Sequence, residues 1–167
     1  TFDGNGFAVS GLYYDNTSTL GSYVGLFASL DENAAISGVT LADSYILAAA
    51  NAGAIVGNNC GGVISSCVNA SVIYTEGSDV GGIVGTNDGL VENCLNQGSV
   101  ICESENAGGI AGYNFGTVQF CGNEGSISNK DNKNESYVGG IAGYLYNGSV
   151  LHCYNVGSIV NKGDYTG

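Results

Sequence analysis

The chain has 167 residues, with 15 acidic residues, three lysines and no arginine, and its net charge is −12. Neutralising phosphates requires lysine or arginine, so this charge argues against nucleic acid as a partner and equally disfavours anionic lipid surfaces. No apolar run approaches the roughly 20 residues needed to span a bilayer, so no membrane insertion is expected. The length and the 44% hydrophobic content are sufficient for one domain with an elongated core.

A sequence pattern recurs along most of the chain at intervals of 27 to 31 residues. Its copies read AGAIVGNNCGGVISSCVNASV from Ala52, VGGIVGTNDGLVENCLNQGSV from Val80, AGGIAGYNFGTVQFCGNEGSI from Ala107 and VGGIAGYLYNGSVLHCYNVGSI from Val138, with a fainter copy from Tyr23. Self-similarity at such a period indicates a stack of structural repeats. We expect a single domain over 1–167, divided into an irregular first coil at 1–22, successive coils at 23–51, 52–79, 80–106, 107–137 and 138–165, and the start of a further coil at 166–167.

The apolar runs within each copy are short, rich in β-branched residues and bounded by Gly and Asn, which favours strands of about three to six residues. A unit of three such strands cannot bury both faces alone, so the copies must stack. The predicted fold is all-β: a right-handed parallel β-solenoid of about six coils, with three short strands per coil. The longest insertion, at 128–137, is polar and is expected to form a loop at one corner.

Stacking places equivalent residues of the repeat in columns. The predicted core column contains Ile55, Ile83, Ile110 and Ile141, with Leu26 as its fainter member. A second column contains Cys67, Cys94, Cys121 and Cys153. A third contains Asn69, Asn96, Asn123 and Asn155, whose amides can hydrogen-bond from rung to rung.

These residues also carry a family resemblance. The pattern GGIxG…VxxCxNxGS[VI] resembles the GLUG-motif repeats of bacterial surface proteins, and the opening TFDGNGFAVSGLYYDN is similar to the segment that often precedes them. The resemblance covers nearly the whole chain. It implies an adhesin-like surface protein, or a segment beside the catalytic part of an immunoglobulin A-specific metallopeptidase.

The six cysteines allow several interpretations. An even cysteine count in a secreted protein suggests disulfides, yet equivalent cysteines on stacked rungs have parallel Cα–Cβ vectors that suit bridging poorly. We expect the column cysteines to be buried free thiols that pack as small hydrophobic groups. Zinc binding is the alternative, although the usual short-spaced ligand pairs are missing, so no metal or other cofactor is predicted.

Catalysis has few candidates in this sequence. Hydrolysis of a glycosidic bond needs two converging carboxylates, and the acids Glu92, Glu103 and Glu105 are interpreted as solvated side chains. The single histidine, His152, occupies the position that Phe120 holds in the preceding coil, and its spacing from other residues supplies no triad. There is no His-Glu-x-x-His motif. We therefore expect a protein that is not an enzyme, with a polysaccharide-degrading enzyme as the competing hypothesis.

One corner of the predicted solenoid is rich in aromatic residues. Tyr113 and Tyr144 are equivalent positions of adjacent coils, as are Phe115 and Tyr146. Exposed aromatic clusters often mark binding sites, and flat rings suit sugars or partner proteins. The alternative is that the rings stack only to stabilise the turn.

The resulting hypothesis is a non-catalytic extracellular module of a bacterial surface protein, acting as a spacer or an adhesive segment. The alternatives are a glycan-binding module that uses the aromatic corner, and a subunit of a self-stacking filament. The expected partners are a host or bacterial surface glycan or protein, together with either the remainder of a longer solenoid or further copies stacked end to end.

Overall fold

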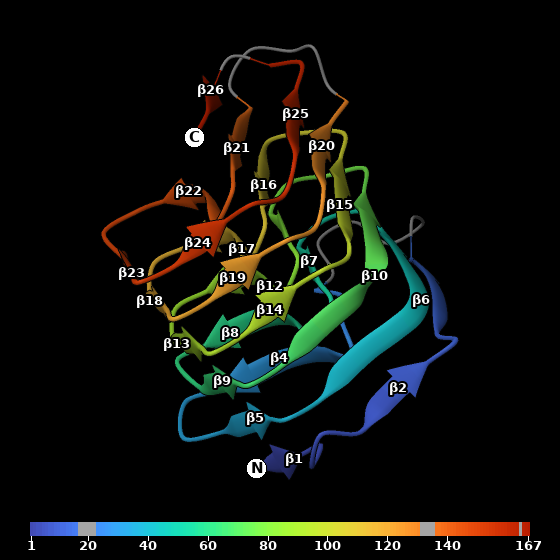
Figure 1. Ribbon diagram of the computed structural model, residues 1–167, viewed down its shortest axis with the longest axis vertical. Helices are drawn as coiled ribbons and strands as arrows, with labels where there is room; N and C mark the ends of the chain where they lie inside the picture. Colours follow the sequence, from blue (N-terminus) through green and yellow to red (C-terminus); the bar gives the residue numbers. More distant parts are fainter. Residues whose placement is uncertain (17–22, 131–135, 164) are drawn as a thin grey trace.

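The computed structural model describes residues 1–16, 23–130, 136–163 and 165–167. Within this part of the chain the regular structure consists of strands alone, stacked as the coils of a parallel β-solenoid. Figure 1 shows the N-terminus at the bottom of the stack and the C-terminus at the top, with successive coils rising between them. None of the described residues form a helix that could cross a membrane.

Four parallel sheets, here named A to D, run along the stack. Sheet A contains β1 (Phe2–Asp3), β5 (Ala35–Ser37), β9 (Val63–Ser65), β13 (Leu90–Glu92), β18 (Thr117–Gln119) and β23 (Ser149–Leu151). Sheet B contains β2 (Ala8–Ser10), β3 (Tyr13–Asn16), β6 (Thr40–Ala48), β10 (Val68–Thr75), β14 (Leu95–Asn96), β15 (Ser99–Cys102), β19 (Gly122–Asn123), β20 (Ile127–Asn129), β24 (Tyr154–Asn155) and β25 (Ile159–Asn161).

Sheet C contains β7 (Ala52–Gly53), β11 (Val80–Gly81), β16 (Asn106–Gly108), β21 (Tyr137–Gly139) and β26 (Tyr165–Thr166). Sheet D contains β4 (Phe27–Asp31), β8 (Val56–Cys60), β12 (Val84–Asn87), β17 (Ala111–Asn114) and β22 (Ala142–Leu145). The coils are in register, because Val91 of β13 pairs with Ile64 of β9 on one side and with Val118 of β18 on the other.

A coil has more strands than the three expected from sequence. The coil at 80–106 is divided into β11, β12, β13, β14 and β15, which belong to four sheets. The extra divisions come from corner residues that bend the chain sharply. Asn93 bends it with a φ of 53°, and Gly82 approaches the next coil so closely that a Cβ there would lie 2.2 Å from the carbonyl oxygen of Gly109.

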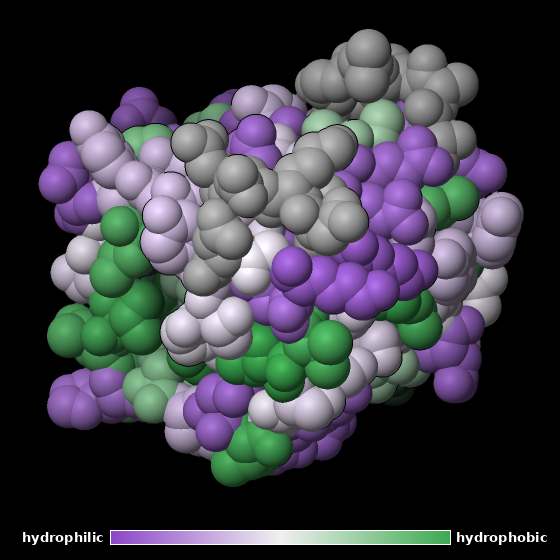
Figure 2. Space-filling model, turned by 90° about the horizontal axis from the view of Figure 1, so that it is seen from above, coloured by the Kyte–Doolittle hydropathy of each residue, from purple (hydrophilic) through white to green (hydrophobic). Residues whose placement is uncertain are grey.

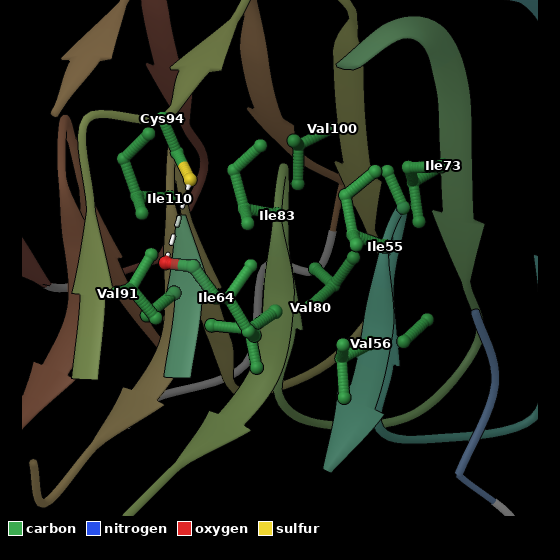
Figure 3. Close-up of a cluster of buried hydrophobic side chains, with 14 of the residues drawn as sticks. Ile55, Val56, Ile64, Ile73, Val80, Ile83, Val91, Cys94, Val100 and Ile110 are labelled. Carbon is green, nitrogen blue, oxygen red and sulfur yellow. Dashed lines mark hydrogen bonds between the residues drawn. The ribbon is translucent and has the colours of Figure 1, made fainter. Parts of the chain in front are cut away.

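The interior of the solenoid is filled by apolar columns, as Figure 3 shows for the middle coils. Ile55, Ile83 and Ile110 point into this interior and are completely buried, whereas Leu26 and Ile141 at the two ends of the column are partly buried. Branched aliphatic side chains at one repeat position thus pack above one another in successive coils. This continuous core is what holds the outward-facing side chains in fixed columns.

The first coil is paired with the next one. β1 pairs with β5, and both β2 and β3 pair with β6, so this segment extends sheets A and B by one rung. Phe7 in this coil is 71% exposed. Half of the polar insertion predicted at 128–137, namely 131–135, lies outside the described residues. At its two ends the predicted loop is replaced by strand, because Ser128 and Asn129 belong to β20 and Tyr137 begins β21.

Candidate binding surface

The aromatic corner, defined as Tyr113, Phe115, Tyr144 and Tyr146, lies where sheet D turns into sheet A. Tyr113 of β17 and Tyr144 of β22 are paired in register, with ring centroids 5.0 Å apart. The centroids of Tyr113 and Phe115 are 4.6 Å apart, and those of Phe115 and Tyr146 are 5.5 Å apart. Phe115 and Tyr146 are 41% and 48% exposed, so the four rings form one packed cluster that reaches solvent.

Two further tyrosines extend this cluster beyond the residues singled out from sequence. The ring of Tyr137 meets that of Tyr144 edge-on at 4.8 Å, and it stacks on that of Tyr165 at 4.9 Å. Tyr137 and Tyr165 precede equivalent residues of successive repeats, Val138 and Thr166, and the two strands pair in register. That repeat equivalence is the sequence signal that could have identified them.

A partly buried carboxyl group lies beside the aromatic corner. Burial raises the pKa of Asp79, the nearby Glu105 raises it further, and a 2.7 Å hydrogen bond donated by Asn106 Nδ2 opposes both. The pKa of the Tyr113 hydroxyl is raised by burial first, and then by Tyr144 and Asp79. The Asp79 carboxyl thus lies close enough to Tyr113 to act on it electrostatically, which disfavours an anionic ligand there.

Glu92, Glu103 and His152, which were considered as catalytic candidates, each contact a residue outside that set. Glu92 accepts a 2.9 Å hydrogen bond from Gln119, and Glu103 lies 4.0 Å from the Lys130 ammonium group. The imidazole of His152 stacks on the Phe120 ring. Among the described residues, no group of three or more His, Cys, Asp or Glu side chains is placed to hold a metal ion.

All six cysteines are free thiols in the structure. In the column, the backbone N–H of Cys67 donates to Cys94 Sγ, that of Cys94 to Cys121 Sγ, and that of Cys121 to Cys153 Sγ, each at 3.4 Å. The dashed line in Figure 3 marks the contact of Cys94 Sγ with the carbonyl oxygen of Ile64, at 3.8 Å. Hydrogen bonds with the neighbouring thiols of Cys121 and Cys67, together with burial, raise the pKa of Cys94.

The asparagine column forms a continuous ladder of side-chain hydrogen bonds. Asn69 Nδ2 donates to Asn96 Oδ1 at 2.8 Å, Asn96 to Asn123 at 2.7 Å, and Asn123 to Asn155 at 2.6 Å. The first three members are completely buried, so the ladder supports the fold rather than facing a ligand.

A second ladder was not identified from sequence. Asn59 Nδ2 donates to Asn87 Oδ1 at 2.8 Å, and Asn87 Nδ2 donates to Asn114 Oδ1 at 2.7 Å. These residues occupy one position of the repeat, just before each turn into sheet A. The recurrence of asparagine at that position is the sequence signal that could have identified the ladder. Leu145 takes the same position in the last coil.

The upper end of the stack is hollowed. A depression of about 740 Å³ is lined by the last members of the core columns, among them Ile141, Val150 and Ile159, and by Tyr165. Figure 2 views the molecule from above, and apolar groups lie among polar ones on this face. An apolar end suits either further coils of a longer solenoid or stacked copies of the chain. Both of these partners remain predictions.

Comparisons with known proteins agree with the recurring pattern. Residues 134–160 match the family described as the GLUG motif. A stretch of 87 residues, 52% of this chain, is 34% identical to halomucin of Haloquadratum walsbyi, and it spans 1% of that protein. No solved structure matches the chain. The expectation from the repeat is thus confirmed: this chain carries a GLUG-motif repeat.

Proposed function

We propose that this chain is a non-catalytic, extracellular repeat module of a surface protein, which acts as a rigid spacer and carries an adhesive surface. The observation that carries the proposal is the in-register stack, in which inward positions repeat while outward positions change from coil to coil. Thr86 pairs with Asn58 and with Tyr113, for example, so one outward column carries three different side chains. Such a scaffold supports variable surface chemistry on a constant core.

The surface location is supported by the GLUG motif, whose repeats the chain resembles along most of its length, and by the similarity to halomucin. The chain spans only 1% of halomucin, so that protein's own role does not transfer to this chain. An antibody raised against the 167-residue chain should label intact cells of the source organism. Labelling that requires permeabilised cells would contradict an extracellular location.

The adhesive part of the proposal places a glycan on the aromatic corner. Exposed rings bind the apolar faces of sugars, and Phe115 and Tyr146 present such rings at the outer edge of the cluster. A glycan array probed with the chain should give binding that Tyr146→Ala weakens by about tenfold, which corresponds to about 1.4 kcal/mol.

Tyr14→Ala is the matched control, because Tyr14 is also a half-exposed tyrosine and lies in β3, far along the stack from the corner. This control should bind like the unaltered chain. No binding on the array, or equal binding by Tyr146→Ala, would refute the adhesive role of the corner while leaving the spacer role standing.

The non-catalytic part is tested separately. Incubation of the chain with acidic polysaccharides, with and without calcium, should release no product. Product release that persists in several independently purified samples, and is lost when Glu92 or Glu103 becomes Gln, would overturn this part and favour a polysaccharide-degrading enzyme.

A further inference from the structure

A second ring pair lies at the opposite end of the sheet A strands. Phe120 follows β18 and His152 follows β23, and their rings stack with centroids 5.1 Å apart and planes 11° apart. Phe120 is 54% exposed. Each ring therefore covers one face of the other, and the exposed remainder of the pair lies outside the solenoid, beyond the end of sheet A that is remote from Phe115.

The backbone at this position is demanding for an aromatic residue. Phe120 and His152 both have a φ of 53°, as do Ser66 and Asn93 in the same column, and the lowest coil places Gly38 there at 62°. Gly and Asn suit this left-handed conformation, whereas a bulky side chain adopts it at a cost. Phe120 thus places an exposed ring at a position where small or polar residues serve the turn equally well. Residues held in such an unfavourable backbone conformation cluster at functional sites.

Polar groups with fixed orientations follow the ring pair along the chain. The Tyr154 ring lies over Gly122, where an added Cβ would be 2.4 Å from the ring, and its hydroxyl donates to Glu124 Oε1 at 3.0 Å. Glu124 Oε2 accepts from Gln97 Nε2, also at 3.0 Å. These two hydrogen bonds lower the pKa of Glu124, so its carboxylate is ionised at neutral pH.

A second carboxylate–amide pair joins two neighbouring strands of sheet A. Gln119 Nε2 donates to Glu92 Oε2 at 2.9 Å, and Gln119 immediately precedes Phe120. From Phe115 to Phe120 the backbone can reach at most about 18 Å, which suits a short oligosaccharide. Rings thus lie before and after β18, and an oriented carboxylate–amide pair lies on the same sheet.

We infer that Phe120, His152 and Tyr154 form a second subsite for a neutral oligosaccharide that lies across the ends of β18 and β23. This inference rests on the proposed binding role of the aromatic corner, which supplies the first subsite. Apolar faces of the sugar rings pack against the exposed edges and outer faces of the aromatic rings, and sugar hydroxyls donate to the carboxylates of Glu92 and Glu124. A uronic acid or sialic acid is excluded by those same carboxylates, since no arginine exists in the chain to neutralise it.

The single histidine of the sequence gives a specific reporter for this subsite. The imidazole C2 proton of His152 should give a single histidine NMR signal, which can be followed while the chain is titrated with neutral hexasaccharides of glucose, mannose, xylose and N-acetylglucosamine. A hexamer of galacturonic acid serves as the anionic probe. The inference expects at least one neutral probe to shift the signal in a saturable way, and the anionic probe to leave it unchanged.

The test variant is Phe120→Asn, which installs the residue type that Asn93 already has at the same φ, so the fold is expected to be retained or made more stable. Binding of the active neutral probe should weaken by about tenfold. The matched control is Ser66→Asn, which installs asparagine at the equivalent position two coils lower. This control should leave binding unchanged. Melting temperatures of both variants check that loss of binding is not loss of folding.

The outcomes separate the two proposals. One outcome is that a neutral probe binds, Tyr146→Ala weakens its binding, Phe120→Asn does not, and the His152 signal stays unchanged. This outcome would refute the second subsite and leave the aromatic corner standing. If no probe binds by calorimetry or NMR, both proposals are overturned. A shift caused equally by the galacturonic acid hexamer would overturn the assignment of a neutral ligand.

Discussion

Asn96 accepts a hydrogen bond from Asn69 in the coil below it and donates one to Asn123 in the coil above. Its Oδ1 also accepts the Gly98 N–H at 3.2 Å, so a single completely buried amide joins three coils and one turn. This arrangement makes the ladder a main determinant of how strongly neighbouring coils are coupled.

Asn96→Ala should therefore lower the free energy of unfolding by about 2–4 kcal/mol, because it leaves buried partners unpaired and opens a small void. Chemical denaturation followed by circular dichroism measures this change. Asn155→Ala, at the exposed end of the same ladder, is the control and should cost clearly less. Equal losses in the two variants would show that burial of the ladder is unimportant.

Asp79→Asn should stabilise the protein at pH 7. Burial, which is the largest cause, raises the folded-state pKa of Asp79, so the folded state binds the proton more tightly than the unfolded state. The contribution of Asp79 to the free energy of unfolding then falls as the pH rises from the unfolded pKa, about 3.9, through the raised folded-state pKa. Above the folded-state pKa the full destabilisation is present. Asparagine avoids that cost.

Denaturation curves of the Asp79→Asn variant at pH values from about 3 to 8 test this sign. Its advantage should be greatest at neutral pH and should disappear below the unfolded pKa, where both states are protonated. Glu124→Gln is the control of opposite sign, because hydrogen bonds from Gln97 and Tyr154 lower the pKa of Glu124. An Asp79→Asn variant that gains nothing at pH 7 would contradict the burial argument.

Thiol labelling should distinguish Cys60 from the column cysteines. Cys60 is exposed, whereas Cys67, Cys94 and Cys121 are buried. A maleimide reagent should modify Cys60 first in the native protein, and all six thiols after denaturation without a reductant, as counted by mass spectrometry. Column cysteines that remain unmodified after such denaturation would have to be bridged, and the column geometry would be wrong.

Salt should stabilise this chain. A net charge of −12 makes the folded state repel itself, and raising the ionic strength from about 0.1 M to 1 M shortens the screening length from about 10 Å to 3 Å. The melting temperature should therefore rise with sodium chloride. Replacing the exposed acids Glu32, Asp88 and Glu105 by their amides should reduce that response, and an unchanged response would argue that salt acts through something other than repulsion.

The repeat made much of the fold and part of the candidate surface predictable. Residues at one repeat position occupy one column, so the period alone was enough to place Tyr113 and Tyr144 side by side, and they are paired in register. The same argument applied to Tyr137 and Tyr165 would have extended the cluster. The number of strands was harder to obtain, because corners depend on backbone angles at single residues such as Asn93.

The periodicity alone predicted which residues repeat and that they stack as parallel coils, because short apolar runs that recur every 27 to 31 residues can bury their core in few other ways. The folded structure was needed to show where each coil bends, how far Asp79 is buried, and that the rings of Phe120 and His152 lie flat against each other outside the stack. The physical reason is that columns follow from period alone. The direction in which an outward side chain points follows instead from local φ values and from the contacts that its neighbouring coils allow.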